Sequence, residues 1–220
     1  MAEKKEVRNN INNGRIPSKY FLPIFILVSL TIFGVTGYFI TSWVNKSVEV
    51  GTVGGEKVHK NYYIYYMYET KGEIEKENGL ESDEDKASFW SDKENIDGAK
   101  EIALQKMQRY VVVNDKAKEE RVSATHDQET SLEIDYRDKY REYGMNVDSE
   151  YYTKTYGISF DAYKVVMKTI FQNENYKALI MEKEGIDEDK FEENIQKEMD
   201  SGAYDLVLND KVYNSIQFDW

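Results

Sequence analysis

Histidine is the residue type in this sequence best suited to acid–base or metal chemistry, and the chain has two, His59 and His126. Both stand where helices are expected to begin, and there is no cysteine. No H-E-x-x-H or similar ligand spacing surrounds them, so a catalytic or zinc-binding pair would require the fold to bring them together. We interpret them as two exposed histidines in loop-like positions.

Carboxylates and glycines offer two further kinds of site. The acidic runs at residues 83–85 and 187–189 lack the alternating oxygen ligands and central glycine of a calcium loop. No G-x-x-x-x-G-K or G-x-G-x-x-G phosphate cradle occurs, and the glycines at 51–55 are typical of a turn. The sequence therefore predicts a protein that is not an enzyme and that needs no cofactor or metal.

Tyrosine is the unusual feature, because five tyrosines fall within seven residues at positions 62–68. On a helix, Tyr63, Tyr66 and Met67 share a stripe that can form core, whereas Tyr65 and Tyr68 point to the opposite side. Two interpretations stay open: later helices bury both sides, or the second side lines a solvent-facing cleft. Tyrosine and methionine suit promiscuous apolar contacts. The candidate peptide-binding residues are Tyr62, Tyr65, Tyr68, Phe89 and Trp90.

The elements that would position these residues are mostly helices, since both prolines precede residue 24. Valines at 48, 50 and 53 before Gly54-Gly55 predict a strand and tight turn, with a return strand at 56–58. An acidic loop is expected at 81–85, and a closing strand at 204–208. Residues 211–220 could be a strand or a helical turn. Helices are predicted at about 61–78, 96–121, 125–144, 148–157, 159–184 and 187–199.

A long apolar segment separates a basic tail from the rest of the chain. Residues 20–44 carry no acidic or basic side chain, and their length suffices to cross a bilayer. A cleaved signal peptide is disfavoured, because the segment is long and lacks an A-x-A cleavage pattern. The tail, residues 1–19, has five Lys or Arg against two Glu, which favours a cytoplasmic N-terminus. We therefore predict a single-pass cell-membrane protein whose domain at 45–220 is extracytoplasmic.

The net charge of the chain limits the classes of partner that it is expected to bind. Its net charge is −12 even with the basic tail included. An acidic surface repels phosphate, so nucleic acid is not an expected partner. The expected contact with lipid is through residues 20–44 alone.

Three motifs in order resemble the SurA/PrsA-type extracytoplasmic foldases. The sequence V-G-T-V-G-G-E-K-V at 50–58 is similar to that family's "V-x-x-V-N-G-x-x-I" strand and turn. Phe89-Trp90 followed by the helix that ends in Ala117-Lys118 resembles the family's second helix. Y-G-I-S-F-D-A-Y at 156–163 is similar to the start of a long later helix. The likeness covers roughly residues 48–200.

The resemblance implies a mainly α N-terminal chaperone domain with a small β-ribbon, in which strand 204–208 pairs with strand 48–53. Gly54 replaces the usual Asn of the turn, and glycine also accepts positive φ. Nothing resembles the parvulin-type isomerase domain that many members insert. The resemblance therefore implies binding of unfolded or secreted polypeptides without prolyl isomerisation.

Three functions follow from these observations. The first is a membrane-anchored bacterial chaperone-like protein with an aromatic cleft. The second is a non-catalytic scaffold or subunit of one envelope protein complex, in which the same aromatics form a fixed interface. The third, a degenerate enzyme using His59 or His126, rests on the presence of those histidines alone.

Overall fold

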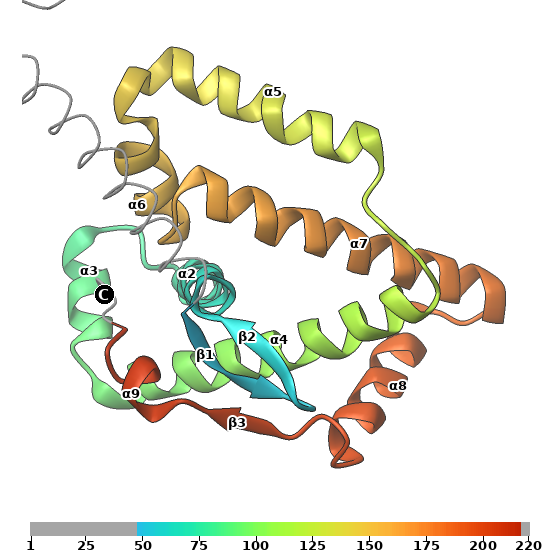
Figure 1. The fold of residues 1–220 in the computed structure, drawn as a ribbon. Coiled ribbons are helices and arrows are strands. Elements are labelled where there is room, and N and C mark those ends of the chain that lie inside the picture. Colours follow the sequence, from blue (N-terminus) through green and yellow to red (C-terminus); the bar gives the residue numbers. More distant parts are fainter. Residues whose placement is uncertain (1–47, 217–220) are drawn as a thin grey trace, which may run out of the picture. The chain divides into compact units, whose positions relative to one another are not determined.

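A three-stranded antiparallel sheet brings together the two ends of the chain that the computed structural model describes, residues 48–216 (Figure 1). Strands β1 (Glu49–Val53), β2 (Glu56–His59) and β3 (Leu206–Leu208) lie in the order β2-β1-β3. The register pairs Gly51 with Leu208, and a Cβ on Gly51 would lie 2.4 Å from the Val207 carbonyl oxygen. The predicted hairpin and the pairing of the first and last strands are confirmed, although β3 is shorter than expected.

Helices α2 (Lys60–Glu77) and α4 (Lys93–Glu119) form the centre of the domain. Each begins and ends within a few residues of its predicted bounds, and Asn78 caps the end of α2 before Gly79, whose φ is +63°. The core stripe of Tyr63, Tyr66 and Met67 is buried as predicted. It belongs to a cluster that also contains alanines and Met107 of α4.

The expected acidic loop at 81–85 is wrong, because helix α3 (Asp83–Trp90) begins inside it. The Ser82 hydroxyl accepts a hydrogen bond from the Asp85 amide at 3.1 Å, which caps the helix. Three acidic side chains occupy the first turn, where the helix dipole favours negative charge. The run of carboxylates therefore starts a helix instead of forming a loop.

Helix α5 (His126–Tyr143) opens with the predicted capping box. The Thr125 side chain accepts from the Gln128 amide, and the Gln128 side chain accepts from the Thr125 amide. The chain then turns back through a short 3₁₀ helix at residues 144–146, a π-helical turn at 148–152 and α6 (Thr153–Tyr156). Gly157 ends α6 with φ +70°, so the predicted short helix at 148–157 is an irregular one.

The remaining helices complete the domain. Helix α7 (Phe160–Glu184) is capped by Ser159, as predicted, and α8 (Glu188–Asp200) is capped by Asp187. For residues 211–220 the sequence allowed either a strand or a helical turn. In the structure this segment begins as a turn of helix, α9 (Asp210–Tyr213). Figure 1 shows α7 running between α5 and α4, so α5 lies on the far side of α7 from the sheet.

The predicted tail (1–19) and membrane segment (20–44) lie outside the described residues. Within residues 48–216, no helix combines the length and apolar character needed to cross a bilayer.

Candidate functional site

The aromatic face of α2 does not form an open cleft, because later helices cover it. Tyr65 is only 8% exposed, and its ring stacks on that of Tyr156 in α6 at 6.1 Å between centroids. Its hydroxyl donates to the Met167 sulfur in α7 at 3.7 Å. Tyr68 packs against the Cα of Gly157 so closely that a Cβ there would lie 2.3 Å from its ring. Of the two interpretations, the structure therefore confirms the one in which later helices bury both sides of α2.

The other three predicted contact residues lie on different parts of the core. Trp90 is 3% exposed and donates its indole N–H to Glu75 at 3.0 Å. Phe89 packs edge-to-face on Trp90, with centroids 4.9 Å apart. Tyr62 is half-buried, with its ring 4.8 Å from that of Tyr110 in α4. The structure brings together Phe89 and Trp90 on α3, but it does not gather the five residues into one binding surface.

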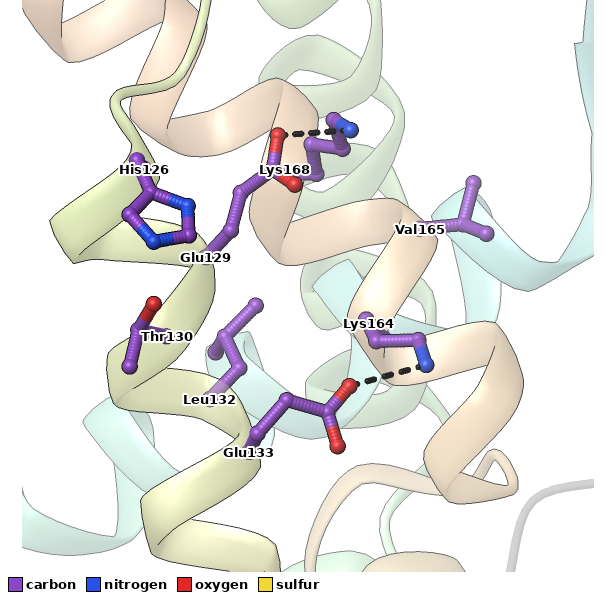
Figure 2. Close-up of a pocket in the computed structure, with 8 residues that line it drawn as sticks. All are labelled: His126, Glu129, Thr130, Leu132, Glu133, Lys164, Val165 and Lys168. Atoms are coloured by element: carbon purple, nitrogen blue, oxygen red, sulfur yellow. Dashed lines mark hydrogen bonds and ion pairs between the residues drawn. The ribbon is translucent and has the colours of Figure 1, made fainter.

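A groove of about 460 Å³ lies instead between α5 and α7 (Figure 2). We call it the α5–α7 groove. Leu132 of α5 forms its apolar floor at 5% exposure, and Val165 of α7 stands at its side 52% exposed. Its lining comes only from these two helices and consists of His126, Glu129, Thr130, Leu132, Glu133, Lys164, Val165 and Lys168.

Two ion pairs connect the walls of the α5–α7 groove, as the dashed lines in Figure 2 show. Glu129 contacts Lys168 at 2.6 Å, and Glu133 contacts Lys164 at 3.1 Å. The carboxylates all come from α5 and the ammonium groups from α7. Each of these side chains is substantially exposed, so water screens the pairs and they can exchange for other partners at low cost.

A pair of amides fixes α5 to α7 beyond the His126 end of the α5–α7 groove. Gln128 donates its side-chain N–H to the Asn175 oxygen at 3.0 Å, and Asn175 donates back at 2.9 Å. Asn175 also donates to the carbonyl of Ser123 at 2.9 Å. One α7 side chain therefore holds both the start of α5 and the segment leading into it.

Aromatic stacking fixes α5 at the other end. The Tyr136 ring stacks on Phe160 of α7 with centroids 4.1 Å apart. The Tyr152 hydroxyl donates to Asp135 at 3.0 Å. Burial, and then this hydrogen bond, raise the pKa of Tyr152 well above its usual value, so it stays neutral and donating. Between these two attachments, Leu132 is the only α5 side chain that is buried.

The two histidines do not form a site. His126 lines the α5–α7 groove at the start of α5, while His59 ends β2 and has a buried Nδ1 without a hydrogen-bond partner. Among residues 48–216, no group of three or more His, Asp or Glu side chains could hold a metal ion. The prediction of two exposed histidines is confirmed for His126 and wrong for His59, which is half-buried.

The α5–α7 groove was not predicted from the sequence because six of its eight lining residues are of polar or charged types, which are equally typical of a solvated helix surface. One signal was present: helix 126–143 has a narrow apolar stripe at Leu132, Tyr136, Tyr140 and Tyr143. Such a stripe can cover only part of a neighbouring helix, and Tyr140 is in fact exposed.

Comparison with known proteins finds no matching family model, curated protein or solved structure. The resemblance to SurA/PrsA-type foldases therefore stays a prediction from three sequence motifs.

Proposed function

We propose that this chain is a membrane-tethered, non-catalytic, chaperone-like protein that binds unfolded or exported polypeptides outside the cytoplasm. The tether and its orientation rest on the apolar segment at 20–44 and the basic tail before it. The binding site we assign is the α5–α7 groove, in place of the tyrosine face of α2. The observation that carries this assignment is a helix of 18 residues that buries one side chain and leaves an apolar-floored groove against its neighbour.

The chemistry of the α5–α7 groove fits a polypeptide better than a small polar substrate. Leu132 and Val165 offer apolar contact to one or two side chains of a bound segment. Glu129 and Glu133 on one wall can pair with basic residues, and the lysines on the other wall can pair with acidic ones. Because the two glutamates and the two lysines of the groove already pair with one another, a client exchanges ion pairs and adds apolar contact. Such a site accepts many sequences.

Filling the α5–α7 groove tests this proposal. The full chain carrying Val165→Trp should lose most of its ability to suppress light scattering by a chemically denatured client. The matched control is Ile134→Trp, because Ile134 is a comparably exposed (51%) α5 residue that does not line the groove. Equal suppression by both variants, or none by the unmodified chain at several-fold excess, would overturn the proposal.

A fixed partner in an envelope complex is the second candidate. The attachments at both ends of α5 hold the groove in one geometry, which favours one complementary partner. A photo-crosslinking residue at Thr130, in cells, separates the two functions. A ladder of crosslinked products indicates varied clients, whereas one dominant product indicates a dedicated partner.

A further inference from the structure

The two edges of the small sheet are built differently. Edge strand β2 carries Glu56 and Lys57, which form ion pairs with Lys118 at 3.0 Å and Glu49 at 2.7 Å. Charged side chains of this kind are the usual protection of an edge strand against pairing with other chains. Edge strand β3 reads Leu206-Val207-Leu208 and carries no charge. Its edge therefore lacks the protection that β2 has.

The backbone groups of β3 that face away from β1 can be identified from the register. Gly54 donates to the Asp205 carbonyl at 3.2 Å, and Asn209 donates to the Val50 carbonyl at 2.8 Å. Hydrogen-bonded pairs alternate along an antiparallel ladder, so Val207 is the residue between them that faces β1. The N–H and C=O groups of Leu206 and Leu208 consequently point outward. In the view of Figure 1, no described element lies beyond β3 on that side.

The side chains around this edge indicate what would pair with it. Val207 is 62% exposed, and Asp205 lies two residues away on the same face. Asp205 is exposed and forms no ion pair within the part of the chain that the structure describes. The chain as a whole has a net charge of −12, so an acidic segment is disfavoured. Charge complementarity selects an apolar strand flanked by basic residues.

We infer that β3 is a strand-addition site for an extended apolar segment with flanking lysine or arginine, which joins the sheet antiparallel to β3. Residues of the added strand opposite Leu206 and Leu208 exchange backbone hydrogen bonds with them. The residue opposite Val207 makes a close side-chain contact, and a basic residue two positions on lies beside Asp205. This surface is separate from the α5–α7 groove and does not depend on it.

The probe is a fluorescent peptide with the core Lys-Leu-Val-Leu-Lys, bound to the full chain and measured by anisotropy. N-methylation of the two leucines removes the amides that would donate to β3 and should weaken binding about tenfold or more. N-methylation of the central valine, whose amide points away from β3, should change the affinity by less than about threefold. Equal losses for the two methylated peptides, or no binding of the parent peptide, would overturn the inference.

Two protein variants locate the binding. Leu208→Pro removes an outward donor while leaving the β1–β3 ladder intact, and Val207→Lys gives β3 the protection seen on β2. Both should abolish peptide binding, with circular dichroism confirming the fold. Val165→Trp in the α5–α7 groove should leave the difference in affinity between the two N-methylated peptides unchanged. Loss of peptide binding in Val165→Trp alone would place the peptide in the groove and sink the strand-addition site. Failure of the client assay with intact peptide binding would instead sink only the proposed function.

Discussion

The 27-residue helix α4 buries eight of its side chains, whereas the 18-residue helix α5 buries only Leu132. Helix α4 contacts α2, α7 and α8, so its stability comes from packing along its length. Helix α5 depends on a cap, one amide pair and a stack of aromatic rings at its ends. A helix that is attached mainly at its two ends can therefore leave a groove along its middle that is open for binding.

The largest expected effect on stability comes from a substitution in α4, the more extensively buried of the two helices. Met107→Ala removes a fully buried α4 side chain and should lower the free energy of unfolding by about 2–5 kcal/mol. Leu132→Ala should cost less than half as much, because water can enter from the α5–α7 groove. Urea denaturation of both variants measures the difference. Similar losses would mean that α5 is packed as firmly as α4.

Detaching the start of α5 should have the next largest effect. Asn175→Ala removes the amide pair with Gln128 and the bond to Ser123, which should destabilise α5 locally by about 1–2 kcal/mol. Hydrogen exchange at the backbone amides of residues 126–132 should rise several-fold, with little change in α4. Gln196→Ala, which removes an exposed bond within α8, is the control. Unchanged exchange in α5 would show that stacking alone holds the helix.

Acid should weaken the partly buried ion pairs that Glu192 of α8 forms with Arg109 and Lys177. Burial alone would raise the pKa of Glu192, but hydrogen bonds from Arg109 and Lys177 outweigh it and lower the pKa. The stabilising contribution of these ion pairs is therefore fully present above the ordinary glutamate pKa of 4.5 and is lost as the pH falls through the lowered value. Stability against urea should decrease with falling pH in this range, and Glu192→Gln should flatten the decrease. An unchanged slope in that variant would assign the acid sensitivity to other carboxylates.

The smallest expected effect concerns the ion pairs across the α5–α7 groove. A double-mutant cycle on Glu133 and Lys164 should give a coupling of about 0.2–1 kcal/mol that falls with added salt. A coupling well above this range would mean that the pairs lock the groove shut, which argues against exchange with a client.

Much of the fold could be predicted because its signals are local. Thr125 and Ser159 cap helices through hydrogen bonds to backbone amides three residues away, so nearby sequence is enough. Helix α3 was missed because a run of carboxylates is equally typical of a solvated loop. The residue that favours a helix here is Ser82, whose side-chain hydroxyl accepts a hydrogen bond from the backbone amide of Asp85, three residues later. A serine three residues before Asp85 is a signal of a helix start that the sequence itself contains.

The candidate site could not be predicted in the same way, because it depends on contacts between distant segments. Tyr65 is buried by Tyr156 and Met167, about a hundred residues further along the chain. The α5–α7 groove exists because Asn175 and Phe160 hold α5 at two points, and neither residue type signals a groove by itself. A helical wheel gives the side on which a residue lies but not whether a later helix covers it.

The position of β1 has a consequence for the order in which the chain folds during synthesis. Its hairpin partner β2 follows within a few residues, but its other partner, β3, comes only after every long helix. A nascent chain that has not yet reached Leu208 therefore presents the β1 edge, including the bare backbone at Gly51, without its final strand. The sheet is complete only when β3 has been synthesised. Until then, strands of other chains can pair with the exposed edge of β1.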